Sequence, residues 1–337
     1  MQVLVVGLGS MGKRRIRNLI KLGFKNIIGF DPRLDRREEV EKLYKISTIS
    51  TIKEGLKDNP SCMIISTPPN LHYKYASISI KNNIHFFTEV NLSSQDVKKI
   101  TLQLKKKPII GLPSSTLLYH PLIKKLKILL NQKEIGKTLT VYHHFGHYLP
   151  NWHPWEDYRD FYVSKKETGA AREIIPFELV WLTHLFSNIN SVYGSIHKVS
   201  KLKANIDDLY QSMIEFSSGV KCIMVIDVIS DPAFSETKII GEKGVILCDH
   251  NEGIIKIGKN SKWEKIQIKS GEVAKGYKGN TPSESLYVDE MRNFMTAIKR
   301  KKLPNYTFED ELKILKVLDS MELSNKKSRK ITISKKN

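Results

Sequence analysis

The chain of 337 residues lacks several features that would assign it to a membrane, secreted or metal-binding class. No apolar run approaches the ~18 residues of a membrane-spanning helix. Only three cysteines occur, far apart in apolar surroundings, which favours reduced, buried thiols over a disulfide framework. No Cys or His spacing is typical of zinc sites. The chain begins directly with a strand pattern, so no signal peptide is expected. We therefore expect a cytoplasmic protein without a metal centre.

Acidic residues are scarce relative to basic ones. The 35 Asp and Glu residues stand against 55 Lys and Arg, which gives a formal net charge of +20. Such an excess can serve nucleic acid or an anionic membrane. The lysines are scattered over predicted helix faces, however, and form no stripe with interleaved aromatic residues. We expect neither partner, and the positive field suits an anionic small molecule such as a phosphorylated or nucleotide-linked sugar.

The first 31 residues combine two apolar runs, a glycine-rich turn and a helix pattern. In order, these are the run 1–6, Gly-Leu-Gly-Ser-Met-Gly at 7–12, the basic helix pattern 13–22, the run 27–30 and Asp31. This order of strand, turn, helix, strand and acid is the arrangement that holds a dinucleotide.

Each glycine of this turn has a separate expected role. Gly7 permits the tight turn, Gly9 lets the backbone approach a pyrophosphate, and Gly12 lets helix and strand pack closely. The helix N-terminus offers N–H groups and a positive dipole end to the phosphates. The predicted phosphate-binding residues are Gly7, Gly9, Ser10, Met11 and Gly12. Asp31 can accept both hydroxyls of an adenosine ribose.

The alternation of apolar runs and helix patterns continues to about residue 118. It predicts a Rossmann domain over residues 1–118, with a doubly wound parallel sheet that binds ligands at the carboxyl ends of its strands. From residue 119 the texture changes, and strand-like segments over 192–268 are punctuated by glycines. Residues 119–337 are therefore predicted to form a second domain, with a large, mostly antiparallel sheet flanked by helices. The predicted fold class is α/β followed by α+β.

Five motifs, spread over essentially the full chain, resemble one known family. They are Gly-Leu-Gly-Ser-Met-Gly (7–12), Ser-Thr-Pro-Pro-Asn-Leu-His (66–72), His-Phe-Phe-Thr-Glu (85–89), Tyr-Val-Asp-Glu-Met-Arg-Asn-Phe (287–294) and Phe-Glu-Asp (308–310). In these the chain resembles the Gfo/Idh/MocA oxidoreductases, the glucose–fructose oxidoreductase and inositol dehydrogenase family. Members bind NAD or NADP and act on a secondary alcohol of a sugar, cyclitol or nucleotide sugar. The resemblance implies that the nicotinamide-ribose side is lined by Thr67, Pro68, Asn70 and His72, with Glu89 near the nicotinamide.

The motif that carries the family's proton chemistry is different in this chain. The family usually has Glu-Lys-Pro after the fifth strand, where this chain has Glu89-Val90-Asn91. It usually places an Asp and, three residues later, a His on a helix after a Gly-Gly turn, and here Ile174 and Phe177 occupy those positions. Hydride transfer from an alcohol needs a group that takes the hydroxyl proton. Val90, Ile174 and Phe177 cannot take it.

Three hypotheses follow. The first is an active oxidoreductase with a relocated acid/base: Glu173 as base with Arg172 beside it, near a helix N-terminus that favours an anion. An exposed first-turn acid that only complements the helix dipole is an equally open interpretation of Glu173. The second hypothesis is a binding or regulatory protein that keeps NAD but has lost turnover. The third is different chemistry on this scaffold, such as hydride return to a bound intermediate.

The aromatic segment 148–162 is the candidate substrate wall. Its Trp, Tyr, His and Arg side chains combine stacking faces with hydrogen-bond donors, which suits a sugar or nucleotide. The same residue types are typical of subunit contacts, so both interpretations stay open. Lys165 follows and could meet a phosphate as a point charge. The predicted substrate residues are His147, Tyr148, Trp152, Trp155, Tyr158 and Lys165.

The sequence thus predicts an NAD-dependent oxidoreductase that forms a dimer or tetramer and acts on a sugar or nucleotide sugar, in carbohydrate biosynthesis. Asp31 favours NAD over NADP, because its charge repels a 2′-phosphate. Arg33 weakens this preference without reversing it.

Overall fold

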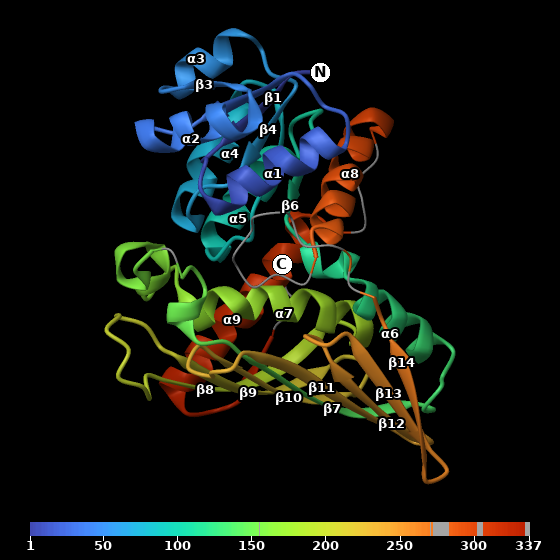
Figure 1. Cartoon of the computed structure of the whole chain (residues 1–337). Helices are drawn as coiled ribbons and strands as arrows, with labels where there is room; N and C mark the ends of the chain where they lie inside the picture. The colour runs from blue at the N-terminus through green and yellow to red at the C-terminus, as the bar shows by residue number, and fades with distance from the viewer. Residues whose placement is uncertain (155, 270, 272–282, 302–305, 334–337) are drawn as a thin grey trace. The chain divides into compact units, whose positions relative to one another are not determined.

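The computed structural model describes residues 1–154, 156–269, 271, 283–301 and 306–333 (Figure 1). The chain divides into two compact units. The first comprises Met1–Thr116 and Ser285–Lys313, and the second Leu117–Glu284 and Ile314–Asn337. Residues 285–313, which the sequence analysis assigned to the second domain, thus belong by their contacts to the first unit. Their amphipathic pattern shows that they pack against a core, but it does not show which core.

The first unit contains a six-stranded parallel sheet of order β3-β2-β1-β4-β5-β6. Its strands are β1 (Val3–Val6), β2 (Ile27–Phe30), β3 (Ser47–Ile49), β4 (Cys62–Ile65), β5 (His85–Thr88) and β6 (Gly111–Pro113). β1 and β4 are fully buried, which explains their continuous apolar runs. The predicted Rossmann sheet is confirmed. The half-exposed edge strand β3 was not predicted, because three residues give no clear period.

Helices cover both faces of this sheet (Figure 1). They are α1 (Ser10–Lys21), α2 (Leu34–Tyr44), α3 (Ile52–Lys57), α4 (His72–Lys81), α5 (Ser94–Leu104) and α8 (Ser285–Arg300). Val3 and Val5 share one core with residues of α1 and α8. On the opposite face, Ser79 of α4 contacts Met63, and Phe308 at the start of α9 (Phe308–Lys327) packs on Phe86.

The second unit contains a nine-stranded sheet of order β14-β13-β12-β11-β7-β10-β9-β8-β15. The strands are β7 (Thr138–Gly146), β8 (Ile189–His197), β9 (Leu209–Phe216), β10 (Lys221–Asp227), β11 (Phe234–Gly241), β12 (Gly244–Asp249), β13 (Ile254–Lys259), β14 (Lys262–Gln267) and β15 (Ile331–Thr332). Neighbouring strands are antiparallel except β7 and β10. The predicted large, mostly antiparallel sheet is confirmed.

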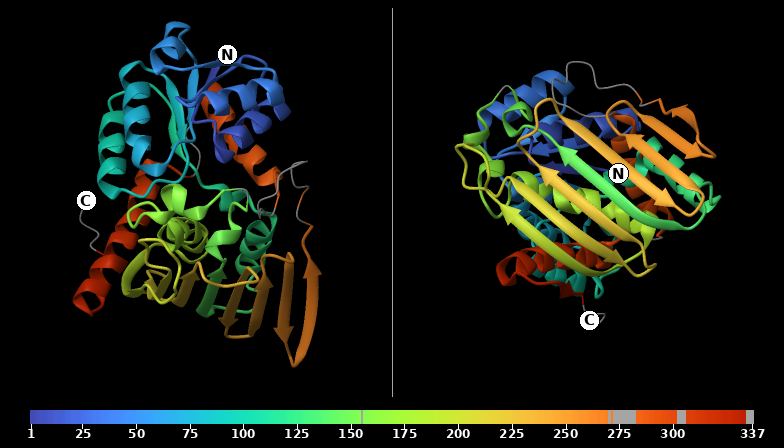
Figure 2. Two further views of the ribbon diagram at one scale, coloured as in Figure 1. Left: turned by 60° about the vertical axis from the view of Figure 1, so that its left-hand side comes forward. Right: turned by 90° about the horizontal axis from the view of Figure 1, so that it is seen from below.

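One face of this sheet is covered by α7 (Ala170–Phe186), which contacts β9 and β10 and also packs on α6 (Pro121–Asn131). Val141 and His143 of β7 point into this covered side and are buried, whereas Tyr142 between them is 43% exposed. Figure 2 (right) shows the other face with none of the described helices lying across it. α7 begins at Ala170, and its first residues Ala-Ala-Arg-Glu are good helix formers or tolerated at a helix start.

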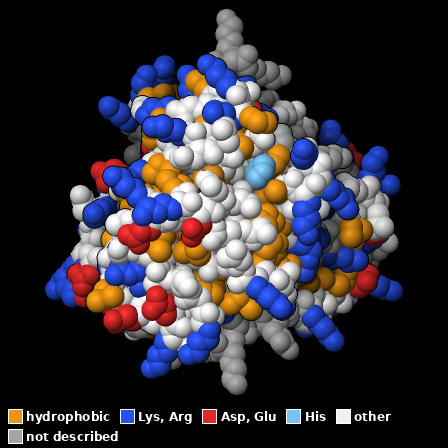
Figure 3. All heavy atoms as spheres, turned by 90° about the horizontal axis from the view of Figure 1, so that it is seen from above, with side chains coloured by type: hydrophobic (Ala, Val, Ile, Leu, Met, Phe, Trp, Pro, Cys, Tyr) orange, Lys and Arg blue, Asp and Glu red, His pale blue; other side chains and the backbone are white. Residues whose placement is uncertain are grey.

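The structure also bears on membrane spans, metal sites and the distribution of surface charge. No helix within the described ranges is long and apolar enough to cross a membrane. The described residues also contain no group of three or more His, Cys, Asp or Glu side chains placed to hold a metal. Lys and Arg side chains lie at many separate places on the face shown in Figure 3, with uncharged surface between them.

Candidate functional site

The glycine turn between β1 and α1 leaves room for a ligand at one position only. Gly7 has a φ of +88°, which L side chains rarely adopt, and a Cβ on Gly12 would lie 1.8 Å from the Gly7 carbonyl oxygen. A Cβ on Gly9 would meet nothing nearer than the Arg36 guanidinium, at 3.6 Å. The fold therefore requires Gly7 and Gly12 to lack side chains, whereas at Gly9 the space is left to a bound group.

The same turn presents the start of α1. Gly9 is the N-cap and supplies no side-chain acceptor, and the first turn contains no acid. The first-turn amides of a helix, here including those of Ser10 and Met11, have no intrahelical acceptor. A pyrophosphate fits these donors and the dipole end behind them.

Asp31 follows β2 and is fixed against the glycine turn. Its Oδ2 accepts the Leu8 amide at 2.9 Å, and its Oδ1 accepts the Arg33 amide at 3.0 Å. The Arg33 side chain is turned to Asp35, at 2.5 Å. Arg36 instead approaches Asp31, with its Nη1 3.5 Å from Oδ2. The basic side chain beside the predicted ribose site is therefore Arg36, which sequence reasoning missed.

The segment after β4 turns through a short 3-10 helix, Pro69–Leu71, into α4. It carries the predicted residues Thr67 and Pro68, which are partly exposed, and Asn70, which is exposed. His72 is 1% exposed, and its Nε2 lies 2.8 Å from the carbonyl oxygen of Thr67. His72 thus supports this segment from beneath, and its contact with a cofactor stays a prediction.

Glu89, directly after β5, is held by a fully buried arginine. Arg15 of α1 donates to Glu89 Oε1 at 2.7 Å and to Oε2 at 2.8 Å. Arg15 also lies 2.8 Å from Glu290 of α8. Burial alone would lower the pKa of Arg15, but the two carboxylates outweigh it and raise that pKa above its ordinary value. The predicted Glu89 is therefore one end of a Glu–Arg–Glu ion pair.

Glu290 in turn fixes the segment after β6. Its carboxylate accepts the Ser114 hydroxyl at 3.0 Å, the Ser115 amide at 2.6 Å and the Thr116 hydroxyl at 2.8 Å. Sequence reasoning missed Arg15 and Glu290, because a basic helix pattern does not distinguish one buried arginine from exposed ones.

In the second unit, Glu173 lies in the first turn of α7. The Tyr162 hydroxyl donates to its Oε1 at 2.9 Å. Its Oε2 is buried without a hydrogen-bond partner among the described residues. Burial raises the pKa of Glu173 to about 8, although the Tyr162 hydrogen bond lowers it. This carboxyl can hold or release a proton near neutral pH.

The other predicted residue at this helix start points elsewhere. Arg172 donates to Glu322 of α9 at 2.6 Å and to the Glu167 carbonyl at 2.9 Å. Ile174 and Phe177, which occupy the positions of the absent Asp and His, are both partly buried.

The predicted substrate residues do not form one cluster. Trp152 donates from its indole to the His147 carbonyl at 3.3 Å, and their rings lie 5.8 Å apart. The Tyr158 hydroxyl accepts the Lys203 amide at 3.1 Å, and Lys165 pairs through its backbone with Asn205. Tyr148 precedes the short 3-10 helix Leu149–Asn151, and Trp155 lies outside the described residues.

Two histidines of β7 are tied into the second unit. His143 lies 2.9 Å from Glu178 of α7, which also accepts the Trp181 indole at 2.6 Å. His144 lies 2.7 Å from Asp227. These partners favour structural roles for both histidines.

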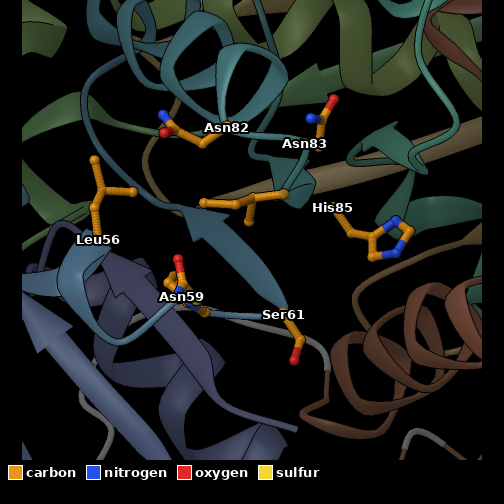
Figure 4. A pocket seen from close by; sticks show the side chains of 8 residues that line it. Leu56, Asn59, Ser61, Asn82, Asn83 and His85 are labelled. Carbon is orange, nitrogen blue, oxygen red and sulfur yellow. The ribbon is translucent and has the colours of Figure 1, made fainter.

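A polar pocket of about 330 Å³ lies at the opposite edge of the first sheet (Figure 4). Its walls include Asn59, Ser61, Asn82 and Asn83, beside the amino ends of β4 and β5. Ligands of such sheets bind at the carboxyl ends, so this pocket is separate from the candidate cofactor site.

Comparison with known proteins agrees with this geometry. Residues 1–110 match the model described as oxidoreductase family, NAD-binding Rossmann fold, and residues 123–247 match the GFO/IDH/MocA C-terminal domain. No curated protein matches the chain.

Solved structures with the same fold are distant in sequence. An oxidoreductase from Agrobacterium radiobacter in complex with NAD+, L-tartaric acid and magnesium is 12% identical, with 98% of each chain covered and a TM-score of 0.85. Levoglucosan dehydrogenase with NADH and levoglucosan is 16% identical over 99% of each chain, with a TM-score of 0.84. GenD2 from gentamicin A biosynthesis, in complex with NAD, is 17% identical over 99% of this chain and 96% of its own, with a TM-score of 0.81.

Proposed function

The chain belongs to the Gfo/Idh/MocA family of NAD(P)-dependent oxidoreductases, and on that premise we propose a specific reaction and site. It transfers hydride between NAD and a secondary alcohol or ketone of a sugar, nucleotide sugar or cyclitol, in cytoplasmic carbohydrate biosynthesis. The observation that carries the proposal is the unfilled space at Gly9, beside the free amides of α1 and the fixed carboxylate of Asp31.

We assign cofactor binding to three segments of the first unit. The turn 7–12 holds the pyrophosphate, and Asp31 accepts the ribose hydroxyls and favours NAD over NADP. The segment 67–72 and Glu89 line the nicotinamide side. The bound nicotinamide supplies the hydride acceptor or donor, and Glu89, pinned by Arg15 at 2.7 Å, keeps one orientation at this edge.

We assign proton transfer to Glu173. With Val90, Ile174 and Phe177 in place of the usual ionisable groups, a general base must come from another position. Glu173 combines a raised pKa of about 8, one oxygen held by Tyr162 and a second without a partner. A base with a pKa near working pH is the most effective. For Arg172 to orient a substrate oxygen, it would have to exchange its contact with Glu322.

The proposed substrate wall comprises His147, Tyr148, Trp152, Tyr158 and Lys165, together with Trp155. The neighbouring rings of Trp152 and His147, 5.8 Å apart and tilted by 37°, support this assignment, because aromatic faces suit sugar rings. One relative, levoglucosan dehydrogenase, has structures in complex with levoglucosan and with L-sorbose, a sugar derivative and a sugar, which supports the substrate class.

A substrate screen tests this proposal. The full chain is incubated with NAD and a panel of cyclitols, sugars and nucleotide sugars, and reduced nicotinamide is followed by absorbance. Glu173→Gln should lower turnover on the order of a hundredfold while NADH affinity is kept. Glu167→Gln, an exposed acid six positions earlier, is the matched control and should change little. Turnover unaffected by Glu173→Gln would keep the enzyme and discard this base.

The second candidate is an NAD-binding protein without turnover. The three apolar residues Val90, Ile174 and Phe177 favour it. It predicts tight NADH binding and no reduced nicotinamide with any substrate of the panel, whether or not Glu173 is present.

We also propose that the outer face of the second unit's sheet joins two copies of the chain. Tyr142, Ile223 and Met213 lie in one row across β7, β10 and β9 and are 43–56% exposed. Such a row on a sheet that the described helices leave uncovered needs an apolar partner, and a two-fold copy presents the same row. Ile223→Glu should shift the mass in solution to the monomer, whereas Leu43→Glu, on α2 of the other unit, should not.

A further inference from the structure

A buried polar cluster of the first unit joins the ends of two strands to α9. It consists of His72 at the start of α4, Asn91 after β5 and Glu311 in the first turn of α9. These residues are 1%, 4% and 1% exposed, respectively. The proposed hydride and proton transfers do not use them.

With the Asn91 amide oxygen toward His72 and its nitrogen toward Glu311, the cluster favours two buried charges. Nδ1 of His72 lies 3.0 Å from Asn91 Oδ1, and Nε2 lies 2.8 Å from the Thr67 carbonyl oxygen. Because both partners are acceptors, the ring must carry both protons. The Asn91 amide then donates to Glu311 Oε2 at 2.9 Å, and this donor together with the nearby imidazolium favours the carboxylate form of Glu311. An imidazolium and a carboxylate would share a dry core.

A half-turn of the Asn91 amide removes both charges. Its nitrogen then donates to Nδ1 of a neutral His72, and its oxygen accepts a proton from a neutral Glu311. Glu311 Oε1 still accepts the Asn91 backbone amide at 3.2 Å, and the Thr88 hydroxyl, 2.9 Å away, becomes the donor. Only the weak contact to the Glu89 carbonyl, at 3.3 Å, is lost. Both arrangements contain the same number of protons.

The surroundings favour the neutral arrangement. Burial lowers the pKa of His72, against which Glu89 acts in the opposite direction. Burial raises the pKa of Glu311 to about 8, although the Asn91 donors lower it. The other groups near Glu311 are Tyr306 and Asp310, neither of which supplies a cation. Lys105 pairs with exposed Glu309, at 3.8 Å.

We infer that Asn91 is a positioning residue whose amide, oriented by a protonated Glu311, fixes His72 as the tautomer that donates from Nε2 to the Thr67 carbonyl. The segments after β4 and β5 are thereby joined in one geometry. The inference rests on the proposed function, because these segments form the proposed nicotinamide side. A proline, usual at position 91 in the family, would have neither the side-chain amide nor the backbone N–H.

Nitrogen NMR of the full chain with labelled histidine tests the inference directly and without any cofactor. The His72 resonances are assigned by comparison with His72→Gln. At pH 7 the inference predicts a neutral ring protonated at Nε2, unchanged in Glu311→Gln, whose side-chain amide reproduces the donor and acceptor of the neutral acid. An imidazolium at His72 would overturn it.

Titration with NADH at pH 7 and pH 9 tests the positioning role. The wild type should bind about fivefold more weakly at pH 9, where Glu311 ionises and a buried hydrogen bond is lost. Glu311→Gln should bind equally at both pH values, and the control Glu309→Gln should keep the wild-type loss. The inference would be overturned if Glu311→Gln still bound NADH more weakly at pH 9 than at pH 7. It would also be overturned if this variant bound NADH more weakly than the wild type at pH 7.

Absent NADH binding and a Glu311→Gln variant that does not fold would each leave another test of the inference. If no variant binds NADH at any pH, the proposed function fails, and the NMR measurement still decides the inference. If Glu311→Gln does not fold, Asn91→Asp replaces it. Its carboxylate beside His72 should convert the ring to an imidazolium at pH 7, and an unchanged His72 would overturn the inference.

Discussion

The two units treat a functional carboxylate in opposite ways. In the first unit, the Glu89 carboxylate accepts two hydrogen bonds from the Arg15 guanidinium, of 2.7 and 2.8 Å. In the second, Glu173 has only the Tyr162 hydroxyl, and its pKa is raised to about 8 by burial. A guanidinium stabilises the ionised form of a carboxylate, whereas burial without a cation stabilises the protonated form. We therefore expect Glu89 to serve as a fixed binding group and Glu173 as the group that exchanges a proton.

The partner of the carboxyl, rather than the unit that contains it, decides this behaviour. Glu311 belongs to the first unit, yet no cation of the described residues contacts it, and burial also raises its pKa to about 8. Burial alone does not distinguish Glu290 from Glu311, since they are 3% and 1% exposed, and only Glu290 contacts Arg15.

Removal of the Arg15 guanidinium should have the largest effect on stability among the proposed variants. Arg15→Met leaves Glu89 and Glu290 facing each other without a buried positive charge. We expect the free energy of unfolding to fall by about 3–5 kcal/mol, as measured by urea denaturation. Arg33→Met, which removes an exposed pair with Asp35, should change it by less than about 0.5 kcal/mol. Equal effects of the two variants would show that burial of Arg15 carries no energetic weight.

Glu311, which lacks a cationic partner among the described residues, should make the free energy of unfolding depend on pH. The folded pKa of Glu311, about 8, lies above its ordinary value of 4.5. Its stabilising contribution is therefore fully present below pH 4.5 and is lost as the pH rises through 8. Relative to the wild type, Glu311→Gln should gain on the order of 4 kcal/mol in unfolding free energy between pH 5 and pH 8.5. A difference that is constant over this range would contradict the shift.

Changes in the glycine turn should separate binding from folding. A Cβ at position 9 would meet no protein atom nearer than the Arg36 guanidinium, at 3.6 Å. The melting temperature of Gly9→Val should therefore stay close to that of the wild type. NADH affinity should fall at least about tenfold, because the new side chain occupies the space of the pyrophosphate. Gly12→Ala should instead destabilise the fold, since its Cβ would lie 1.8 Å from Gly7. Calorimetry and thermal melting distinguish the two variants.

The ribose site should show the smallest effect. Asp31→Ala removes the charge that repels a 2′-phosphate and leaves Arg36 beside the site, so the ratio of NADPH to NADH affinity should rise by about tenfold. Asp35→Ala, which removes an exposed acid paired with the Arg33 side chain, is the matched control. An unchanged ratio in Asp31→Ala would remove Asp31 from the ribose site.

Local patterns predicted much of this architecture. Both sheets and the glycine turn follow from apolar runs and glycine spacing, because these depend on residues that are neighbours in sequence. Glu173 could be singled out as a candidate because it lies near a predicted helix N-terminus.

Contacts between distant segments could not be predicted. Asn91 and Glu311 are 220 positions apart, and Arg15 meets Glu89 across 74 positions. Nothing in the sequence around Arg15 separates it from Arg14 or Arg17, and nothing around residues 285–313 indicates which core receives them. Such partners depend on the assembled fold, which brings side chains of remote elements into one buried space.

The pH dependence of turnover tests the central claim that the exchanging proton belongs to Glu173. In the direction of alcohol oxidation, the account predicts that kcat rises about tenfold per pH unit until about pH 8 and then levels. Glu173→Gln should lose both the rise and most of the rate. A flat profile between pH 6 and pH 9, a profile unchanged in Glu173→Gln, or no turnover with any substrate of the panel would contradict the account.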